Sequence, residues 1–163
     1  MTAAEIIRNL DLHPHPEGGW FGETYRSDEK ILAAGLPSRY GEPRAFSTAI
    51  YFLLEAGQFS AFHRLRSDEI WFHHAGGALD VWRIDEQGML HTDQISPDDS
   101  RWQVVFPRGH WFAARPAEGE EFALVGCVVS PGFDFADFEP ASRRSLSEQY
   151  PAHRDLIREL THS

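Results

Sequence analysis

The sequence is poor in cysteine and has no long apolar run, and each shortage excludes a class of protein. Cys127 is the only cysteine among 163 residues, so neither an internal disulfide nor a zinc site built from cysteines can form, which fits a reducing compartment. Its apolar surroundings, LVGCVV, are typical of a buried, unreactive thiol. No segment has the length of a membrane-spanning helix, and the N-terminus lacks the features of a secretory signal. We therefore expect a soluble, cytoplasmic protein.

Positive charge is also scarce. Lys and Arg total 15 against 25 Asp and Glu, which gives a net charge of −10, and the basic residues form no run. Such a surface repels phosphate backbones and anionic lipid headgroups, so we expect neither nucleic acid nor a membrane as a partner. Hydrophobic residues make up 42% of the chain and aromatic residues 13%. This composition supports a sizeable core, and we expect one domain over residues 1–163.

Strand signals dominate from about residue 17 to about residue 140. Short segments rich in aromatic and β-branched residues are separated by turns of Gly, Pro, Asp or Ser, with no helix between them. This pattern indicates an all-β antiparallel sandwich or barrel. Residues 27–44 look like a surface loop. The expected strands are WFGETYRS, FSTAIYFLL, SAFHRLR, EIWFHH, ALDVWRI, MLHTDQI, WQVVFP, HWFAARP and EFALVGCVVS.

Short helices are expected at the two ends of the chain. Thr2 and Glu5 match a capping box at the start of the first helix, which Pro14 and Pro16 stop. The C-terminal tail covers about residues 141–163. Within it, positions 153, 156, 157 and 160 have the spacing of an amphipathic helix that begins at Pro151 and lies on the barrel.

The stretch GQFSAFHRLRSDEIWFHHAG (57–76) carries two polar residues at a suggestive spacing. Residues two apart on a strand face the same side, so His63 and Leu65 point together. A turn at residues 67–68 reverses the chain, so that Glu69, Trp71 and His73 can face the same interior. Convergent titratable groups in a cavity mark functional sites, and we take His63 and Glu69 as candidate catalytic residues.

The same stretch resembles the first motif of the cupin superfamily, G-x(5)-H-x-H-x(3,4)-E-x(6)-G, and residues 107–112 (PRGHWF) resemble the second, P-x-G-x-x-H. Longer segments narrow the likeness to the cupin type 5 subfamily, long catalogued as a domain of unknown function. It covers about residues 4–140. The resemblance implies a double-stranded β-helix (jelly roll), a homodimer and a pocket inside the barrel, but no settled activity. The segments that carry it are HPEGGWFGETYRS, STAIYFLL, FHRLRSDEIW and VGCVVSPGFDFADFE.

The sequence departs from the metal-binding pattern of cupins. The resemblance implies three histidines and one glutamate as ligands, but Leu65 and Phe112 occupy two of these positions. Two protein ligands seldom hold a metal, so we expect no metal cofactor. The alternative is a divalent metal held by His63, Glu69 and a further nitrogen from His73, His74 or His110.

The remaining candidates have alternative structural readings. His63 could donate to a backbone carbonyl, and a buried Glu69 needs a partner such as His63, Arg64 or Arg66. Trp71, His73, His110 and Arg26 are candidate ligand-binding residues, although Trp71 also suits the core and Arg26 an edge ion pair. The aromatic residues of PGFDFADFE are expected to serve packing. We expect the histidines of the terminal segments on the solvated surface: His13, His15, His153 and His162.

Three functions fit these observations. The first is binding of a small polar, sugar-like or carboxylate ligand in the barrel, with metal-independent isomerase or epimerase chemistry by His63 and Glu69. The second is a metal-dependent oxygenase or isomerase. The third is a non-catalytic ligand-binding or storage protein. We also expect a homodimer, because a jelly roll leaves edge strands that need cover, and the WFGETYRS strand suits an interface.

Overall fold

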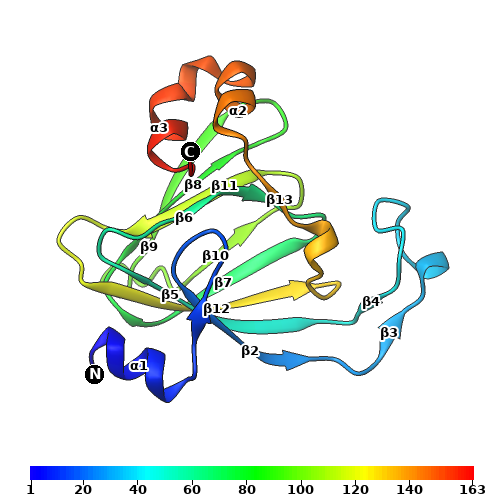
Figure 1. The fold of residues 1–163 in the computed structure, drawn as a ribbon, viewed down its shortest axis with the longest axis horizontal. Helices are drawn as coiled ribbons and strands as arrows, with labels where there is room; N and C mark the ends of the chain where they lie inside the picture. Colours follow the sequence, from blue (N-terminus) through cyan, green and yellow to red (C-terminus); the bar gives the residue numbers. More distant parts are fainter.

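The computed structural model describes all 163 residues, and its centre consists of two antiparallel sheets packed face to face (Figure 1). Neighbouring strands are often distant in sequence, as the expected jelly roll requires, and this fold is confirmed. The first sheet runs in the order β1 (His13–Pro14), β2 (Trp20–Arg26), β5 (Thr48–Glu55), β12 (Phe122–Ser130), β7 (Asp68–Gly76) and β10 (Gln103–Phe106). The second runs β13 (Glu139–Pro140), β6 (Ser60–Arg64), β11 (Trp111–Pro116), β8 (Leu79–Ile84) and β9 (Leu90–Ile95).

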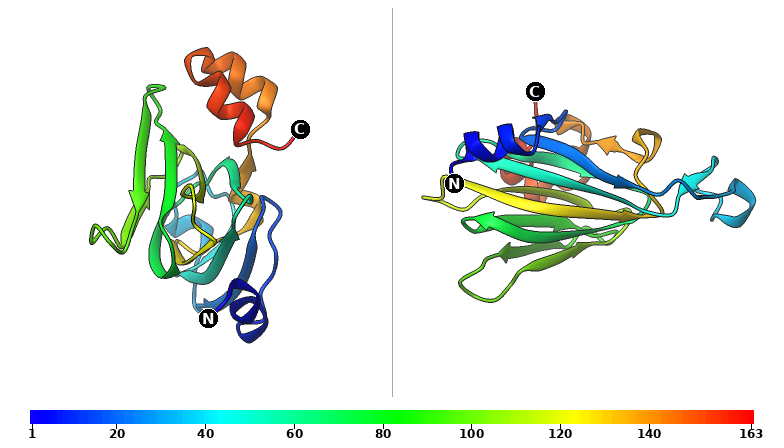
Figure 2. Two further views of the ribbon diagram at one scale, coloured as in Figure 1. Left: turned by 90° about the vertical axis from the view of Figure 1, so that its left-hand side faces the viewer. Right: turned by 90° about the horizontal axis from the view of Figure 1, so that it is seen from below.

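The loop expected at residues 27–44 projects from one end of the sheets (Figures 1 and 2). It contains the two-stranded ribbon of β3 (Lys30–Ile31) and β4 (Arg44–Ala45), with a 3-10 turn, η1 (Ala33–Gly35), between them. At the outer edge of the first sheet, β2 pairs with β1 through Trp20 and Phe21 only. The homodimer that this edge suggested stays a prediction.

The main core lies between the sheets. Phe52 and Trp71 enter it from the first sheet and Phe112 from the second, and all three side chains are almost fully buried. Phe112 stacks on Phe106 with ring centroids 4.1 Å apart. Each of these aromatic side chains buries a large apolar area and so contributes strongly to the stability of the core. The core fills one end of the barrel and leaves the other end, beside β13, open to a cavity.

Helices pack on the outer faces of the two sheets. The capping box of α1 (Ala3–Asn9) is present, with the backbone N–H of Glu5 donating to Thr2 Oγ1 at 3.2 Å and Glu5 returning the bond. The predicted C-terminal helix is η3 (Pro151–His153) followed by α3 (Arg154–Glu159). An additional helix, α2 (Arg143–Gln149), was missed because Leu146 is its only apolar residue. No helix is long and apolar enough to cross a membrane.

Strand alternation on β6 divides the barrel interior from the helices. Phe62 points outward and packs against the C-terminal helices. Its contacts there are Leu146 of α2, Ile157 of α3 and Leu160, which follows α3. His63, the next residue, therefore points inward, against Phe112. The C-terminal helices thus bury the outer face of the same strand whose inner face carries the candidate site.

Candidate ligand cavity in the barrel

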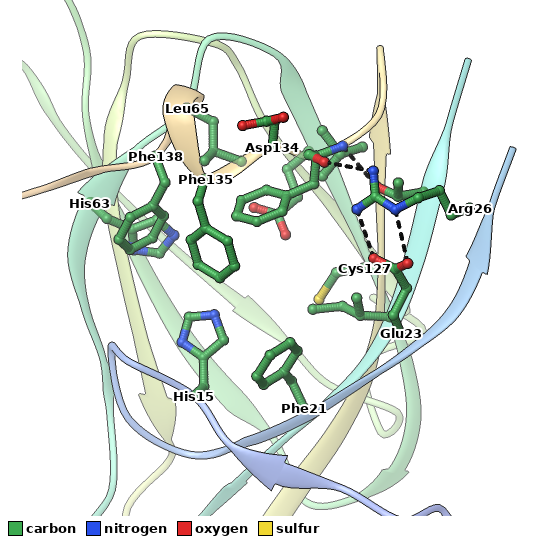
Figure 3. A pocket seen from close by; sticks show the side chains of 15 residues that line it. His15, Phe21, Glu23, Arg26, His63, Leu65, Cys127, Asp134, Phe135 and Phe138 are labelled. Atoms are coloured by element: carbon green, nitrogen blue, oxygen red, sulfur yellow. Dashed lines mark hydrogen bonds and ion pairs between the residues drawn. The ribbon is translucent and has the colours of Figure 1, made fainter. Parts of the chain in front are cut away.

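A cavity of about 330 Å³ opens at the end of the barrel beside the chain from Phe133 to Phe138 (Figure 3). Its walls combine aromatic and aliphatic side chains with a few polar groups, as small-molecule pockets do. His63, Glu69 and Arg26 are brought together here, as the sequence suggested. The lining also includes residues that the sequence did not single out as site residues: His15, Phe21, Cys127, Phe133, Phe135 and Phe138.

His63 is held by the backbone and not by a carboxylate. Its Nδ1 lies 2.7 Å from the carbonyl oxygen of Ala61, which can only accept, so Nδ1 carries the proton and Nε2 presents a lone pair. The ring packs against Phe112 at 4.2 Å and Phe138 at 5.2 Å between centroids. Burial lowers the pKa of His63 to about 4, and the nearby positive charge that His15 could carry acts in the same direction. His63 is therefore a neutral hydrogen-bond acceptor at neutral pH.

His15 corrects one expectation, since it lies in the cavity wall and not on the solvated surface. The turn at residues 15–19 carries it there. Gly18 has φ +105°, and a Cβ at this position would stand 2.2 Å from the carbonyl oxygen of Phe59, so only glycine allows the turn to pack so closely. The ring makes edge contacts with Phe21 and Phe52 at 5.0 and 5.3 Å. In the sequence, the only sign that His15 turns inward was the Gly18-Gly19 pair that follows it.

The backbone also selects the tautomer of His15. The N–H of Glu17 donates to its Nδ1 at 3.0 Å, so Nδ1 is the acceptor and Nε2 carries the proton. Burial lowers the pKa of His15 to about 4. His15 and His63 are therefore opposite in function, because one presents an N–H donor and the other a lone pair, and both are neutral.

Glu69 has none of the three partners expected from the sequence. It forms no ion pair or hydrogen bond with His63, while Arg64 pairs with Glu139 at 2.7 Å and Arg66 reaches Asp137 at 3.7 Å. Burial raises the pKa of Glu69 to about 7. The indole of Trp71 and the thiol of Cys127 lower it in part, by favouring the charged form. A carboxyl group in this state can give or take a proton near neutral pH.

Trp71 lies at the floor of the cavity, as part of the main core. Its indole Nε1 is buried and lacks a hydrogen-bond partner of normal geometry, although it faces the side of Glu69. A recess of about 20 Å³, room for roughly one oxygen atom, is shared by Trp71, Glu69, Cys127 and the two histidines. The side chains that line this atom-sized space, Ser60 among them, therefore carry donors and acceptors of several kinds.

Arg26 lies at the rim, where most of its donors are already engaged. Its Nε and Nη2 donate to Glu23 at 2.9 and 2.8 Å, and its Nη1 donates to the carbonyl oxygen of Phe133 at 3.1 Å (Figure 3). The contact with Glu23 raises the pKa of the guanidinium. Arg26 therefore links Glu23 of β2 to the backbone at Phe133, and few of its N–H groups remain free to bind a ligand.

Two predicted ligand-binding residues lie outside the cavity. His73 bonds through Nε2 to the carbonyl oxygen of Gly77 at 2.9 Å, in the turn after β7. His110 lies beside Arg83, with 3.4 Å between Nδ1 and Nη1, at the entrance to β11. Sequence alternation placed His73 correctly on β7, where it pairs with Val125 in regular register. It lies four residues along the strand from Glu69, away from the end of β7 that lines the cavity.

The chain from Phe133 to Phe138 covers the cavity. The sequence suggested packing for these aromatic residues, and they do pack on one another, but they also form the mouth. The turn η2 (Phe135–Asp137) is fixed by a buried ion pair in which Arg44 of β4 grips Asp137 through two bonds of 2.7 Å. The projecting ribbon therefore holds the cover of the cavity in place.

The donor set does not fit the metal site that the fold suggests. The structure places both substituted positions inward: Leu65 lines the cavity and Phe112 packs on His63. No group of three or more His, Cys, Asp or Glu side chains is arranged to share an ion. His73, His74 and His110, the three candidates for a third ligand, lie elsewhere: none of them lines the cavity, and His74 is exposed beside Tyr51. An apolar wall stands where two of the four ligands would have to be.

Comparison with known proteins agrees with this fold. The model of the family described as "Cupin superfamily (DUF985)" matches residues 4–141. Protein SO0799 from Shewanella oneidensis is 38% identical with a TM-score of 0.88, covering 99% of this chain and 98% of its own. The uncharacterized protein YML079W of Saccharomyces cerevisiae is 31% identical over 82% of this chain and 72% of its own length.

A more distant likeness concerns the fold alone. Oxalate decarboxylase from Bacillus subtilis, which has Mn(II) centres, is 16% identical with a TM-score of 0.54 over 92% of this chain and 37% of its own. Cupin relatives thus include metal proteins, whereas the residues of this cavity are not a metal-ligand set.

Proposed function

The chain belongs to the DUF985 family of the cupin superfamily, and from this premise we propose that its barrel cavity binds a small, polar, uncharged organic group without a metal ion. The observation that carries the proposal is the recess shared by His15, His63, Glu69 and Trp71. The side chains that line this space, which has room for about one oxygen atom, carry two N–H donors, one lone pair, one carboxyl group, the Ser60 hydroxyl and the Cys127 thiol. A hydroxyl or carbonyl group satisfies this set.

The electrostatics of the recess favour a neutral group over an ion. Burial holds both histidines neutral and keeps Glu69 partly protonated at neutral pH. A carboxylate placed here would lose its hydration without meeting a positive charge. Sugar-like and hydroxycarbonyl compounds are therefore the ligand class that the cavity suits.

A proton-transfer reaction is the second part of the proposal, and the pKa of Glu69, about 7, supports it. The ionised carboxylate takes a proton from the carbon next to the ligand carbonyl, and the C–H electron pair forms the double bond of an enolate. His15 and Trp71 donate to the enolate oxygen. For a hydroxycarbonyl ligand, the hydroxyl proton of that carbon then passes to the former carbonyl oxygen. Return of the proton from Glu69 to the former carbonyl carbon completes an isomerisation, with no other reactant consumed.

The binding test uses ligand-observed NMR with a set of aldoses and ketoses, and with hydroxy acids as charged compounds that should bind more weakly. In His63→Asn the amide N–H can still donate to Ala61, but the Nε2 lone pair is lost. We expect about tenfold weaker binding or more, from a hydrogen bond worth about 1.5 kcal/mol. Glu118→Gln, on an exposed loop, is the control and should bind as wild type does. Equal binding by all three proteins would refute the cavity as the site.

The reaction test follows deuterium uptake from heavy water at the carbon next to the carbonyl of any compound that binds. Wild type should exchange this hydrogen, and Glu69→Gln should not. Binding without exchange in wild type would leave a binding protein and refute the proton-transfer step alone.

A further inference from the structure

A second depression, a groove of about 510 Å³, lies against the cavity wall. Leu65 and Phe138 line both the groove and the cavity, so the two spaces share a wall. The character of the groove is nevertheless different, because four of the 15 basic residues of a chain with net charge −10 gather around it. These are Arg39, Arg64, Arg66 and Arg108.

Two of these arginines hold each other in place through the backbone. Arg39 Nε donates to the carbonyl oxygen of Arg66 at 2.9 Å, and Arg66 Nη1 donates to the carbonyl oxygen of Arg39 at 2.8 Å. The reciprocal bonds keep two like charges near each other, which is unfavourable unless an anion lies between them. Both guanidinium groups still have unused N–H donors.

The carboxylates of the groove compensate that positive charge only in part. Asp137 is gripped by Arg44 through two bonds of 2.7 Å, and its nearest approach to Arg66 is 3.7 Å. Glu139 is occupied by Arg64, at 2.7 and 3.1 Å. Glu86 forms no ion pair, so it alone among the acids of the groove opposes an anion.

Arg108 adds a third guanidinium with no partner of its own. The backbone around it is fixed, because its N–H donates to Asp68 Oδ1 at 2.8 Å and the N–H of Gly109 donates to the carbonyl oxygen of Leu65 at 2.9 Å. Its side chain forms no hydrogen bond or ion pair and is exposed at the groove. A rigid turn therefore presents a free cation beside the Arg39–Arg66 pair.

We infer that this groove binds a phosphate group, with Arg39, Arg66 and Arg108 donating to its oxygens. One arginine fork satisfies the two oxygens of a carboxylate, whereas three separate guanidinium groups match an anion with more oxygens and more charge. The shared wall places this phosphate next to the cavity. If one ligand fills both spaces, it is a phosphorylated sugar-like or hydroxycarbonyl compound. This extension rests on the proposed function, whereas the phosphate site itself is independent of it.

The test is calorimetric titration of the full chain with inorganic phosphate and, separately, with acetate at low ionic strength. Arg108→Gln removes a side chain without internal contacts, so its fold should be unchanged, and we expect about tenfold weaker phosphate binding or more. Arg66→Gln should weaken it similarly. Acetate should bind wild type at least about tenfold more weakly than phosphate does.

Two control variants locate the site. Arg158→Gln removes the same charge from a second arginine-rich surface, on α3, and should bind phosphate as wild type does. His63→Asn should also leave phosphate binding unchanged. The inference is overturned if wild type does not bind phosphate, if acetate binds as tightly, if Arg108→Gln binds as wild type does, or if either control loses binding.

Discussion

Two buried groups in the cavity should titrate with opposite effects on stability. His63 is 5% exposed with a pKa near 4 in the folded chain, and Glu69 is 7% exposed with a pKa near 7. Their ordinary values, which apply when the chain unfolds, are 6.5 and 4.5. We therefore expect the pH dependence of the free energy of unfolding to contain two large terms that nearly cancel between pH 7 and pH 4.

The sign of each term follows from where the proton binds. Below pH 6.5 the unfolded chain protonates His63 but the folded chain does not, so stability falls as the pH drops toward 4, by about 3 kcal/mol. For Glu69 the folded chain holds the proton up to about pH 7, whereas the unfolded chain loses it above 4.5. Stability from Glu69 is thus fully present below pH 4.5 and falls by about 3 kcal/mol as the pH rises through 7.

The assay is urea unfolding, followed by tryptophan fluorescence, at pH steps from 4 to 7.5. The wild-type stability minus that of His63→Asn should fall by about 3 kcal/mol from pH 7.5 to pH 4, because only wild type has the His63 term. The same difference for Glu69→Gln should rise by about as much. The other titrating groups are common to all three proteins and cancel in the differences, apart from the coupling of His15 to His63, which acts near pH 4, where His15 itself titrates.

Two results would refute this reasoning. A flat difference for His63→Asn would mean that His63 titrates normally, and therefore that water and counter-charges reach it. A difference for Glu69→Gln that falls toward acid would mean that the carboxylate is ion-paired in the folded chain, contrary to the geometry in the cavity.

Two further predictions concern the cover of the cavity and the missing metal ligands. Asp137→Asn leaves the charge of Arg44 buried and uncompensated, and should destabilise the fold by about 3 kcal/mol in urea unfolding. Glu139→Gln breaks an exposed pair and should cost less than about 1 kcal/mol; equal losses would contradict the role of the buried pair. The double variant Leu65→His, Phe112→His should melt about 5 °C higher or more with added nickel, whereas wild type should not respond. Strong stabilisation of wild type by nickel would overturn the metal-free interpretation.

The sequence by itself determined the fold and half of the candidate site. Period-two alternation and regularly spaced turns are local signals, so they predicted the strands and the inward facing of His63, Leu65 and Glu69. The capping box at Thr2 and Glu5 is local as well, and the helix begins where it predicts. The apolar replacements at positions 65 and 112 could be read directly against the family motif.

Only the tertiary structure decided which groups meet in the cavity. His15 enters it because a glycine turn packs against Phe59, and η2 covers it because Arg44 reaches Asp137, 93 positions away in the sequence. Neither contact has a periodic signature, since each joins distant segments through one turn or one side chain. The protonation states of His15, His63 and Glu69 could not be predicted from the sequence either. Tautomers depend on which backbone atom lies against a ring nitrogen, and the pKa of Glu69 depends on burial without a cation, and both are properties of packing in three dimensions.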